Sequence, residues 1–140
     1  MASLDHTAAS LRIFGDDLDP SKITRLLGHE PTNAETKGQQ IVGSATGNIR
    51  TARSGSWRLD ARKQSPGDLD AQIREILSKL TVDLNVWRNL AERYRIDLFC
   101  GLFLKGVNEG ASISAESLAS LGNRGIEIGL DIYAGDASDT

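Results

Sequence analysis

The sequence has few of the residue types that bind metals or form covalent catalytic centres. It contains a single cysteine, Cys100, and two histidines among 140 residues. One cysteine excludes a disulfide within the chain and any zinc site built from several thiolates. The histidines, His6 and His29, have no partners at metal-ligand spacing, so the sequence predicts no metal site and no cofactor.

Long apolar segments and a secretory signal are also missing. No apolar run approaches the roughly 18–20 residues that a membrane-spanning helix needs. Residues 1–15 lack a basic segment followed by an apolar stretch, so we expect no secretory signal and no membrane association. With the single cysteine, this predicts a soluble cytoplasmic protein. Aromatic residues make up 5% of the chain and the net charge is −3, which disfavours nucleic acid as a partner.

The small net charge conceals two oppositely charged segments. Residues 37–63 carry six basic residues and one acidic residue, whereas residues 106–140 carry six acidic residues and one basic residue. Two interpretations are open. The segments are separate solvated surfaces, or they face each other within the fold or across a dimer.

The apolar content is sufficient for one hydrophobic core. Leu, Ile, Val and Phe account for 35 of the 140 residues, above the level of disordered chains. We therefore expect a single domain over residues 1–140, with residues 1–8 and 135–140 as loose ends.

Apolar alternation and capping residues predict strands and helices in a defined order. The strands are expected at 11–15, near 39–43, and at 56–60, 96–104 and 126–133. The helices are expected after the capping residues Asp19, Asp68, Asp83 and Ser114. This order predicts an α+β two-layer sandwich, with helices on one face of a mostly antiparallel sheet. A ferredoxin-like plait with an extra C-terminal αβ unit fits it best.

The last αβ unit has a clear apolar pattern. Leu118 and Leu121 are predicted on the buried face of its helix, which we expect to end at Gly122. Ile126, Ile128, Leu130 and Ile132 are predicted to point inward from the following strand.

Short motifs in a fixed order carry a family resemblance over residues 10–134. They are Leu18-Asp19-Pro20, Leu26-Leu27-Gly28, Glu30-Pro31-Thr32, Lys37-Gly38, Trp57-Arg58-Leu59, Gly125-Ile126-Glu127-Ile128 and Asp131-Ile132-Tyr133. Together they resemble the bacterial family known as domain of unknown function 4279. The resemblance implies a stand-alone α/β domain and supplies no catalytic residue. Some small bacterial families of this kind are immunity proteins, which by analogy implies an immunity or regulatory role.

Three side chains could carry chemistry, and each has a structural alternative. Trp57 could stack on a ligand, or it lies in the core with its ring nitrogen bonded. His29 could be a general base if a nucleophile and a carboxylate lay nearby, and otherwise is a turn residue. Cys100 is predicted to be buried and unreactive, and only a pairing with His29 would make it catalytic.

One face of the predicted sheet mixes aromatic and charged side chains, which indicates a contact surface. Its members are Arg12, Phe14, Asp97, Phe99, Phe103, Glu127, Asp131 and Tyr133. Their acidic neighbours oppose a phosphate backbone. We expect this face to be covered by a second copy or by the chain's own 37–56 connection.

These features predict a non-catalytic protein-interaction domain with a protein partner or a homodimer. The predicted contact residues are Trp57, Arg53, Arg58, His29, Phe99, Phe103 and Tyr133. The alternative is a small-molecule binding or enzymatic domain. In that case, the 32–58 region would bind an anionic ligand through Arg50, Arg53 or Arg58, with His29 as the base.

Overall fold

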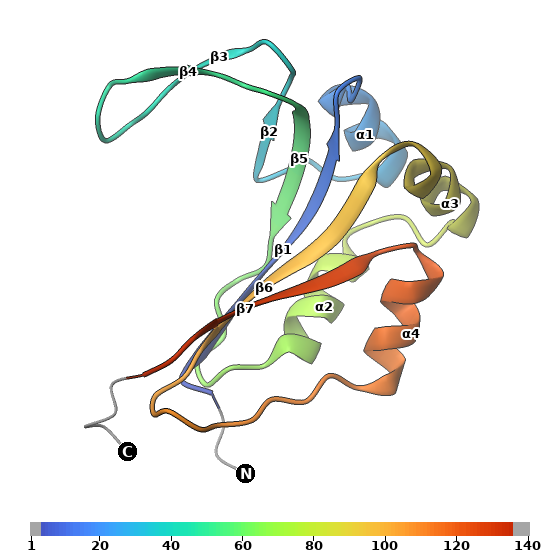
Figure 1. The fold of residues 1–140 in the computed structure, drawn as a ribbon. Helices are drawn as coiled ribbons and strands as arrows, with labels where there is room; N and C mark the ends of the chain where they lie inside the picture. The colour runs from blue at the N-terminus through green and yellow to red at the C-terminus, as the bar shows by residue number, and fades with distance from the viewer. Residues whose placement is uncertain (1–3, 136–140) are drawn as a thin grey trace.

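A computed structural model describes residues 4–135, and it contains a five-stranded sheet with four helices on one side (Figure 1). The strands of this sheet are β1 (His6–Gly15), β2 (Asn33–Glu35), β5 (Gly55–Asp60), β6 (Arg95–Phe103) and β7 (Glu127–Tyr133). The helices are α1 (Pro20–Leu27), α2 (Leu69–Ser78), α3 (Leu84–Arg93) and α4 (Ala115–Asn123). Two further strands, β3 (Gln40–Val42) and β4 (Ile49–Thr51), form a separate hairpin.

The strand order of the sheet is β2-β5-β1-β6-β7. Neighbouring strands run antiparallel except β6 and β7, which run parallel because α4 connects them. Strand β1 is central and pairs with β5 along one edge and with β6 along the other. The predicted α+β class and the mostly antiparallel sheet are confirmed, and the ferredoxin-like plait stays a prediction.

The four predicted helix starts are confirmed, because each capping side chain accepts a hydrogen bond from its own first turn. The N-caps are Asp19, Asp68, Asp83 and Ser114. Gly28 ends α1 in the left-handed conformation, with a φ of 82°, as expected of a C-terminal glycine. Helix α4 instead continues past Gly122 to Asn123, and the left-handed glycine behind it is Gly125, with a φ of 72°.

The first strand begins at His6, five residues before the predicted start. Thr7 is fully buried and Ala9 lies opposite Cys100 of β6. Residues 6–8 therefore belong to the sheet and not to a loose lead-in. Their small and polar side chains give no apolar alternation, whereas their pairing with a distant strand supplies the structure. Residues 1–3 and 136–140 lie outside the described part of the chain.

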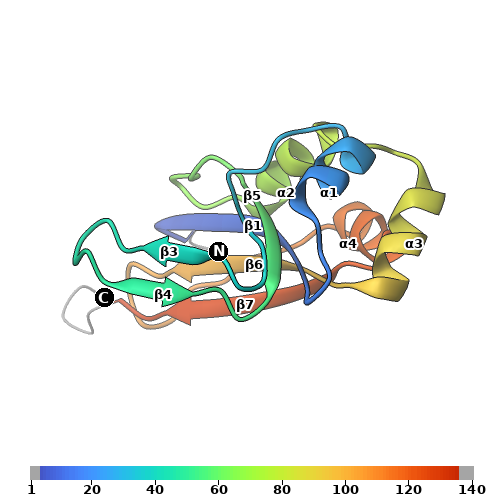
Figure 2. The ribbon, with the colours of Figure 1, turned by 90° about the horizontal axis from the view of Figure 1, so that it is seen from above.

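The connection before β5 contains more structure than the single predicted strand. Strand β2 pairs with β5, and β3 pairs with β4 so that Val42 lies opposite Ile49. We call residues 36–54 the hairpin arm. It projects on the side of the sheet opposite to the helices (Figures 1 and 2). The strand predicted near 39–43 is β3, whereas β2 and β4, with three residues each, were not predicted because so short a segment shows no clear alternation.

The core lies between the sheet and the helix layer, and it includes both tryptophans. Trp57 and Trp87 have no exposed surface. The indole nitrogen of Trp57 donates to the Thr24 hydroxyl at 3.1 Å, and that of Trp87 donates to the Thr81 carbonyl at 2.8 Å. Both rings are therefore buried without an unpaired donor. None of the helices in the described residues is long and apolar enough to cross a membrane.

A buried polar cluster fastens α2 to the central strand. The Thr7 hydroxyl donates to Gln72 Oε1 at 2.8 Å, and Gln72 Nε2 donates to the Thr7 and Arg62 carbonyls at 2.9 and 3.0 Å. The Thr7 hydroxyl also accepts the Asp68 backbone N–H at 3.0 Å. Thr7 and Gln72 are both fully buried. Each group is satisfied inside the protein, so the loss of one partner leaves the others unpaired.

Replacing Gln72 with alanine is expected to lower the free energy of unfolding by about 2–3 kcal/mol, because it leaves a cavity, removes the acceptor of the Thr7 hydroxyl and removes the donor to the Arg62 carbonyl. Urea unfolding of the purified chain measures this change. Gln40→Ala, on the exposed strand β3, is the matched control and should cost less than about 0.5 kcal/mol. Equal losses for the two variants would contradict a structural role for the cluster.

Candidate interaction surface

The side of the sheet without helices carries a stack of three rings at one end. We call this side, which includes Arg12, Phe99, Phe103 and Tyr133, the helix-free face. His6, Phe103 and Tyr133 occupy one row across β1, β6 and β7. The ring centroids of His6 and Phe103 are 4.1 Å apart, and those of Phe103 and Tyr133 are 4.6 Å apart, in nearly parallel planes. Tyr133 remains 47% exposed, so the stack presents aromatic surface to solvent.

The hydroxyl of Tyr133 is held by its neighbour two residues earlier. It donates to the Asp131 carboxylate at 2.5 Å. This hydrogen bond raises the pKa of Tyr133, because it favours the protonated phenol beside a negative charge. The phenol therefore stays neutral and its ring keeps a fixed orientation at the rim of the stack.

A second group on the same face is built around an ion pair. Arg12 Nε and an Nη of Arg12 donate to the two oxygens of Asp97 at 2.8 and 2.7 Å. The guanidinium carbon lies 4.4 Å from the centroid of the Phe99 ring and 5.1 Å from that of Phe14. Asp97 is 3% exposed, and its hydrogen bonds raise the pKa of Arg12. Bidentate pairing and cation–π contact fix this guanidinium in one position.

The residues between the ring stack and the Arg12–Asp97 pair are small, so the helix-free face is shallow there. A Cβ at Gly101 would lie 3.0 Å from the Phe103 ring, so glycine is needed for that ring to lie flat on the sheet. A hollow of about 290 Å³ lies beside the stack. It is lined by His6, Ala8, Ala9, Ser10, Asp60, Ala61, Lys63 and Phe103.

The hairpin arm adds an apolar and basic surface on the same side. Val42 and Ile49, which lie opposite each other, are 64% and 65% exposed. The arm holds three basic residues and no acidic residue. Arg50 bonds to Glu35 at 2.6 Å and Lys37 bonds to Asp16 at 3.1 Å, and these pairs tie the arm to the body of the domain. Arg53 is exposed.

The predicted contact residues fall into two groups. Phe99, Phe103 and Tyr133 lie on the helix-free face, as their two-residue spacing predicted. Arg58 lies on it too, opposite Arg12, where it forms a 3.1 Å ion pair with Asp60.

Trp57 is fully buried against Thr24, so its ring has no surface for a ligand and its position agrees with the core alternative. His29 lies in the turn after α1. Its Nδ1 is 2.7 Å from the Glu30 carbonyl oxygen, which can only accept, so this nitrogen donates.

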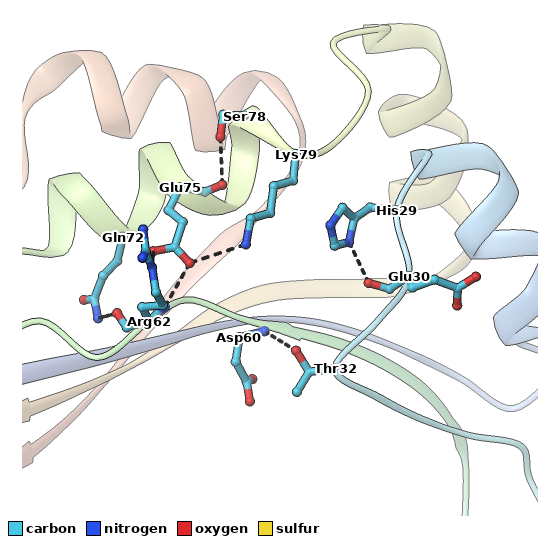
Figure 3. A network of polar contacts seen from close by, with 9 residues as sticks. All are labelled: His29, Glu30, Thr32, Asp60, Arg62, Gln72, Glu75, Ser78 and Lys79. Carbon is cyan, nitrogen blue, oxygen red and sulfur yellow. Dashed lines mark hydrogen bonds and ion pairs between the residues drawn. The ribbon is translucent and has the colours of Figure 1, made fainter.

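His29 borders a polar network on the helix side of the sheet (Figure 3). Glu75 accepts the Arg62 backbone N–H at 2.9 Å and pairs with Lys79 at 3.5 Å, while Thr32 accepts the Asp60 N–H at 2.9 Å. In Figure 3, no bond joins the Glu75 cluster to the Thr32–Asp60 pair or to His29. Among the residues drawn, no hydroxyl is bonded to the His29 ring, so the network is structural and not a nucleophile–base pair.

The other elements of a catalytic or anion-binding site are dispersed. Cys100 is fully buried on the helix side, and desolvation raises its pKa to about 12. Arg50 pairs with Glu35 and Arg58 pairs with Asp60, so these two arginines of the 32–58 region face separate carboxylates. Across residues 4–135, no ion pair joins the basic 37–63 segment to the acidic 106–135 segment. Within the described residues, the two segments are therefore not joined by direct salt bridges.

Two further hollows lie between helices, and the sequence pattern gave no sign of them. A groove of about 250 Å³ between α1 and α3 is lined by Lys22, Ile23, Leu26, Val86, Asn89, Leu90, Arg93 and Tyr94. Another, of about 370 Å³ between α2 and α4, includes Arg74 and Arg124. In the described residues, no group of three or more His, Cys, Asp or Glu side chains could hold a metal ion.

The sequence model of the family described as Domain of unknown function (DUF4279) matches residues 5–135. The chain belongs to this family. The match extends from the residue before β1 to the end of the described chain, so the DUF4279 domain includes the helix-free face and the hairpin arm. No curated protein and no solved structure matches the chain.

Replacing Arg12 with methionine is expected to lower the free energy of unfolding by about 2–3 kcal/mol, because it leaves the buried Asp97 carboxylate without its partner. Arg95 lies 4.0 Å from Asp97 and is largely exposed, so it compensates only in part. The control is Lys37→Met, which removes an exposed pair and should cost less than about 0.5 kcal/mol. Chemical denaturation of both variants checks the difference, and a smaller loss for Arg12→Met than for the control would refute it.

Cys100 is expected to resist alkylation by iodoacetamide at pH 8 in the native state, because its pKa of about 12 leaves almost no thiolate. The same reagent should modify it fully in denaturant. Mass spectrometry of the intact chain measures both reactions. Rapid modification of the folded protein would show that the thiol is accessible and ionised.

Proposed function

We propose that this chain is a non-catalytic protein-interaction domain. Its partner is a protein that presents apolar side chains flanked by carboxylates to the hairpin arm and the helix-free face. The observation that carries the proposal is the pair Val42 and Ile49, side by side on the arm and about two-thirds exposed.

The exposed side chains of Val42 and Ile49 on the arm would be stabilised by a second surface that covers them. An isolated hairpin is at best marginally stable in water, since it has no layer to pack against. The arm projects on the side of the sheet without helices (Figure 2), and Phe103 and Tyr133 belong to that face. Buried aromatic and aliphatic anchors supply most of the energy of a protein interface. Both parts of this surface therefore have the composition of binding anchors.

The charge of the arm defines the chemistry of the partner. Its basic residues are not balanced by any acidic residue within residues 36–54. Arg53 is exposed on the arm, where it can pair with a carboxylate of the partner. A nucleic acid would place phosphates against Glu127 and Asp131 of β7, which repel them. An acidic and apolar protein surface brings no phosphates against β7. The basic arm would attract it and raise its association rate at low salt.

The positions of the candidate nucleophile and base support binding over catalysis. His29 bonds to a backbone carbonyl in a turn, and Cys100 is buried among apolar side chains. Neither residue lies on the helix-free face or the arm.

Replacing Ile49 with aspartate is expected to abolish partner binding, because it places a charge on the apolar pair and offsets the basic charge of the arm. The tagged full chain captures partners from an extract of its source cells, and each one identified is purified and titrated against the variants. Wild type should bind at least tenfold more tightly than Ile49→Asp, and affinity should fall with added salt.

Val82→Asp is the matched control, since Val82 is 78% exposed in the connection between α2 and α3 and lies on neither proposed surface. It should bind like wild type. The proposal fails if both variants bind equally, or if no protein binds the wild-type chain specifically at low salt.

The anionic-ligand alternative makes a different prediction. Inorganic phosphate or a small dicarboxylate would raise the melting temperature of the wild-type chain, and Arg53→Ala would remove that rise. If the ligand raises the melting temperature in this way, and Ile49→Asp leaves partner binding unchanged, the anionic-ligand alternative is favoured.

A further inference from the structure

We propose that the free edge of β7 pairs antiparallel with β7 of a second copy of this chain. The two five-stranded sheets would then join into one continuous sheet across a two-fold axis. This inference goes beyond the proposed function, because it concerns the edge of the sheet and not the arm or the helix-free face.

Strand β7 has one unpaired edge. It ends the strand order, and β6 occupies its other edge through parallel pairing from Asp97–Glu127 to Phe103–Tyr133. The Leu104 N–H donates to the Tyr133 carbonyl at 2.9 Å, so Tyr133 turns its polar backbone groups toward β6. Backbone groups alternate along a strand. The N–H and C=O groups of Ile128, Leu130 and Ile132 therefore point to the free edge.

The apolar side chains next to this edge are not covered by the helix layer. Leu130 and Ile132 lie on the helix side, in register with Cys100 and Leu102, yet they are 49% and 60% exposed. They border a hollow of about 210 Å³ that also includes Leu104 and Ile113. Proteins usually protect a long edge strand with charge, proline or a covering segment. No described segment covers the outer edge of β7.

The sequence of β7 is complementary to itself in one register. When the strand and its copy run antiparallel with Leu130 opposite Leu130, Ile128 faces Ile132 on the helix side. On the opposite side, Glu127 faces Tyr133 and Gly129 faces Asp131. Apolar residues then meet apolar residues, and no two like charges lie directly opposite each other.

Neighbouring registers are excluded by charge or by hydrogen bonding. Centring the pair on Gly129 sets Glu127 opposite Asp131 twice, and centring it on Asp131 sets the two Asp131 carboxylates opposite each other. If the two-fold axis passed between two residues, each residue with its backbone N–H and C=O toward the free edge would face a residue with these groups toward β6. The hydrogen bonds between the two copies would then not form. The centre at Leu130 is also the one that pairs all of Glu127–Tyr133.

This self-complementarity favours a second copy over an unrelated strand. A two-fold axis through Leu130 makes each residue meet the same partner in both directions, which is the defining property of an isologous interface. It would bury Leu130 and Ile132 of both chains together, so both exposed apolar patches are covered by one contact.

Sedimentation equilibrium of the full chain tests the pairing. We expect twice the 15.1 kDa chain mass at high concentration, with dissociation on dilution. Gly129→Asp would place a carboxylate opposite Asp131 at two symmetric positions and should raise the dimer dissociation constant about tenfold. A Cβ at Gly129 has room, because its nearest neighbour is a Phe99 ring carbon at 3.8 Å.

Two companion variants isolate the charge. Gly129→Asn has nearly the same size and should leave the dissociation constant within about threefold of wild type, whereas Gly129→Lys should lower it by about tenfold by facing Asp131. Equal dissociation constants for the aspartate and lysine variants would overturn the proposal. So would a chain mass of 15.1 kDa at every concentration up to about 1 mM.

Leu130→Pro tests the hydrogen bonds directly. The Leu130 N–H points to the free edge, so proline removes no bond to β6 but removes the central bonds between copies. This variant should be monomeric with an unchanged circular dichroism spectrum. A dimer that persists in both Leu130→Pro and Gly129→Asp would overturn the proposal by locating the contact elsewhere. The Leu130 side chain lies on the helix side, so Leu130→Pro alters neither the arm nor the helix-free face, and its result is independent of the partner titration.

Discussion

Strand β1 hydrogen-bonds along both of its edges, and the placement of every other layer depends on that pairing. Leu11 lies opposite Leu59 of β5 on one side and opposite Leu98 of β6 on the other. The partners are far apart in the sequence, so the chain loses much conformational entropy before these contacts form. Once they form, the helices pack on one side of the sheet, where Gln72 of α2 bonds to Thr7 of β1, and the other side carries no helix (Figure 1).

Local chemistry explains why the helices were predictable. A capping side chain such as Asp19 or Ser114 bonds to its own first turn, and the apolar stripe behind it is visible in a short stretch of sequence. Strands β5, β6 and β7 were also recognised, because each alternates over six or more residues. Fold class follows from the order of such elements.

The features that the sequence did not predict depend on contacts between residues that are far apart in the chain. The start of β1 is stabilised by β6, and β2 exists because β5 lies beside it. Leu130 was assigned to the correct face, yet it remains half exposed, because no helix covers the edge of the sheet. Leu118 was predicted in the core and is 48% exposed for a related reason, since α4 buries Ser117 and Leu121 instead.

The candidate site was predictable in part. Period-two alternation placed Phe99, Phe103 and Tyr133 on one face, and the register of β6 with β7 sets Phe103 beside Tyr133. The ion pair of Arg12 with Asp97 and the projection of the arm required the strand order, which no local pattern contains. His29 lies in the turn after α1, whereas Arg58 lies on the helix-free face opposite Arg12, a separation that also depends on the strand order.

The hairpin arm contributes almost nothing to the core, since Ala52 is its one buried side chain. Its sequence and length can therefore change in evolution without opening the hydrophobic interior. Selection for a new partner would act on the arm, and selection for folding would act on β1 and its neighbours. The arm and the scaffold can therefore change independently of each other.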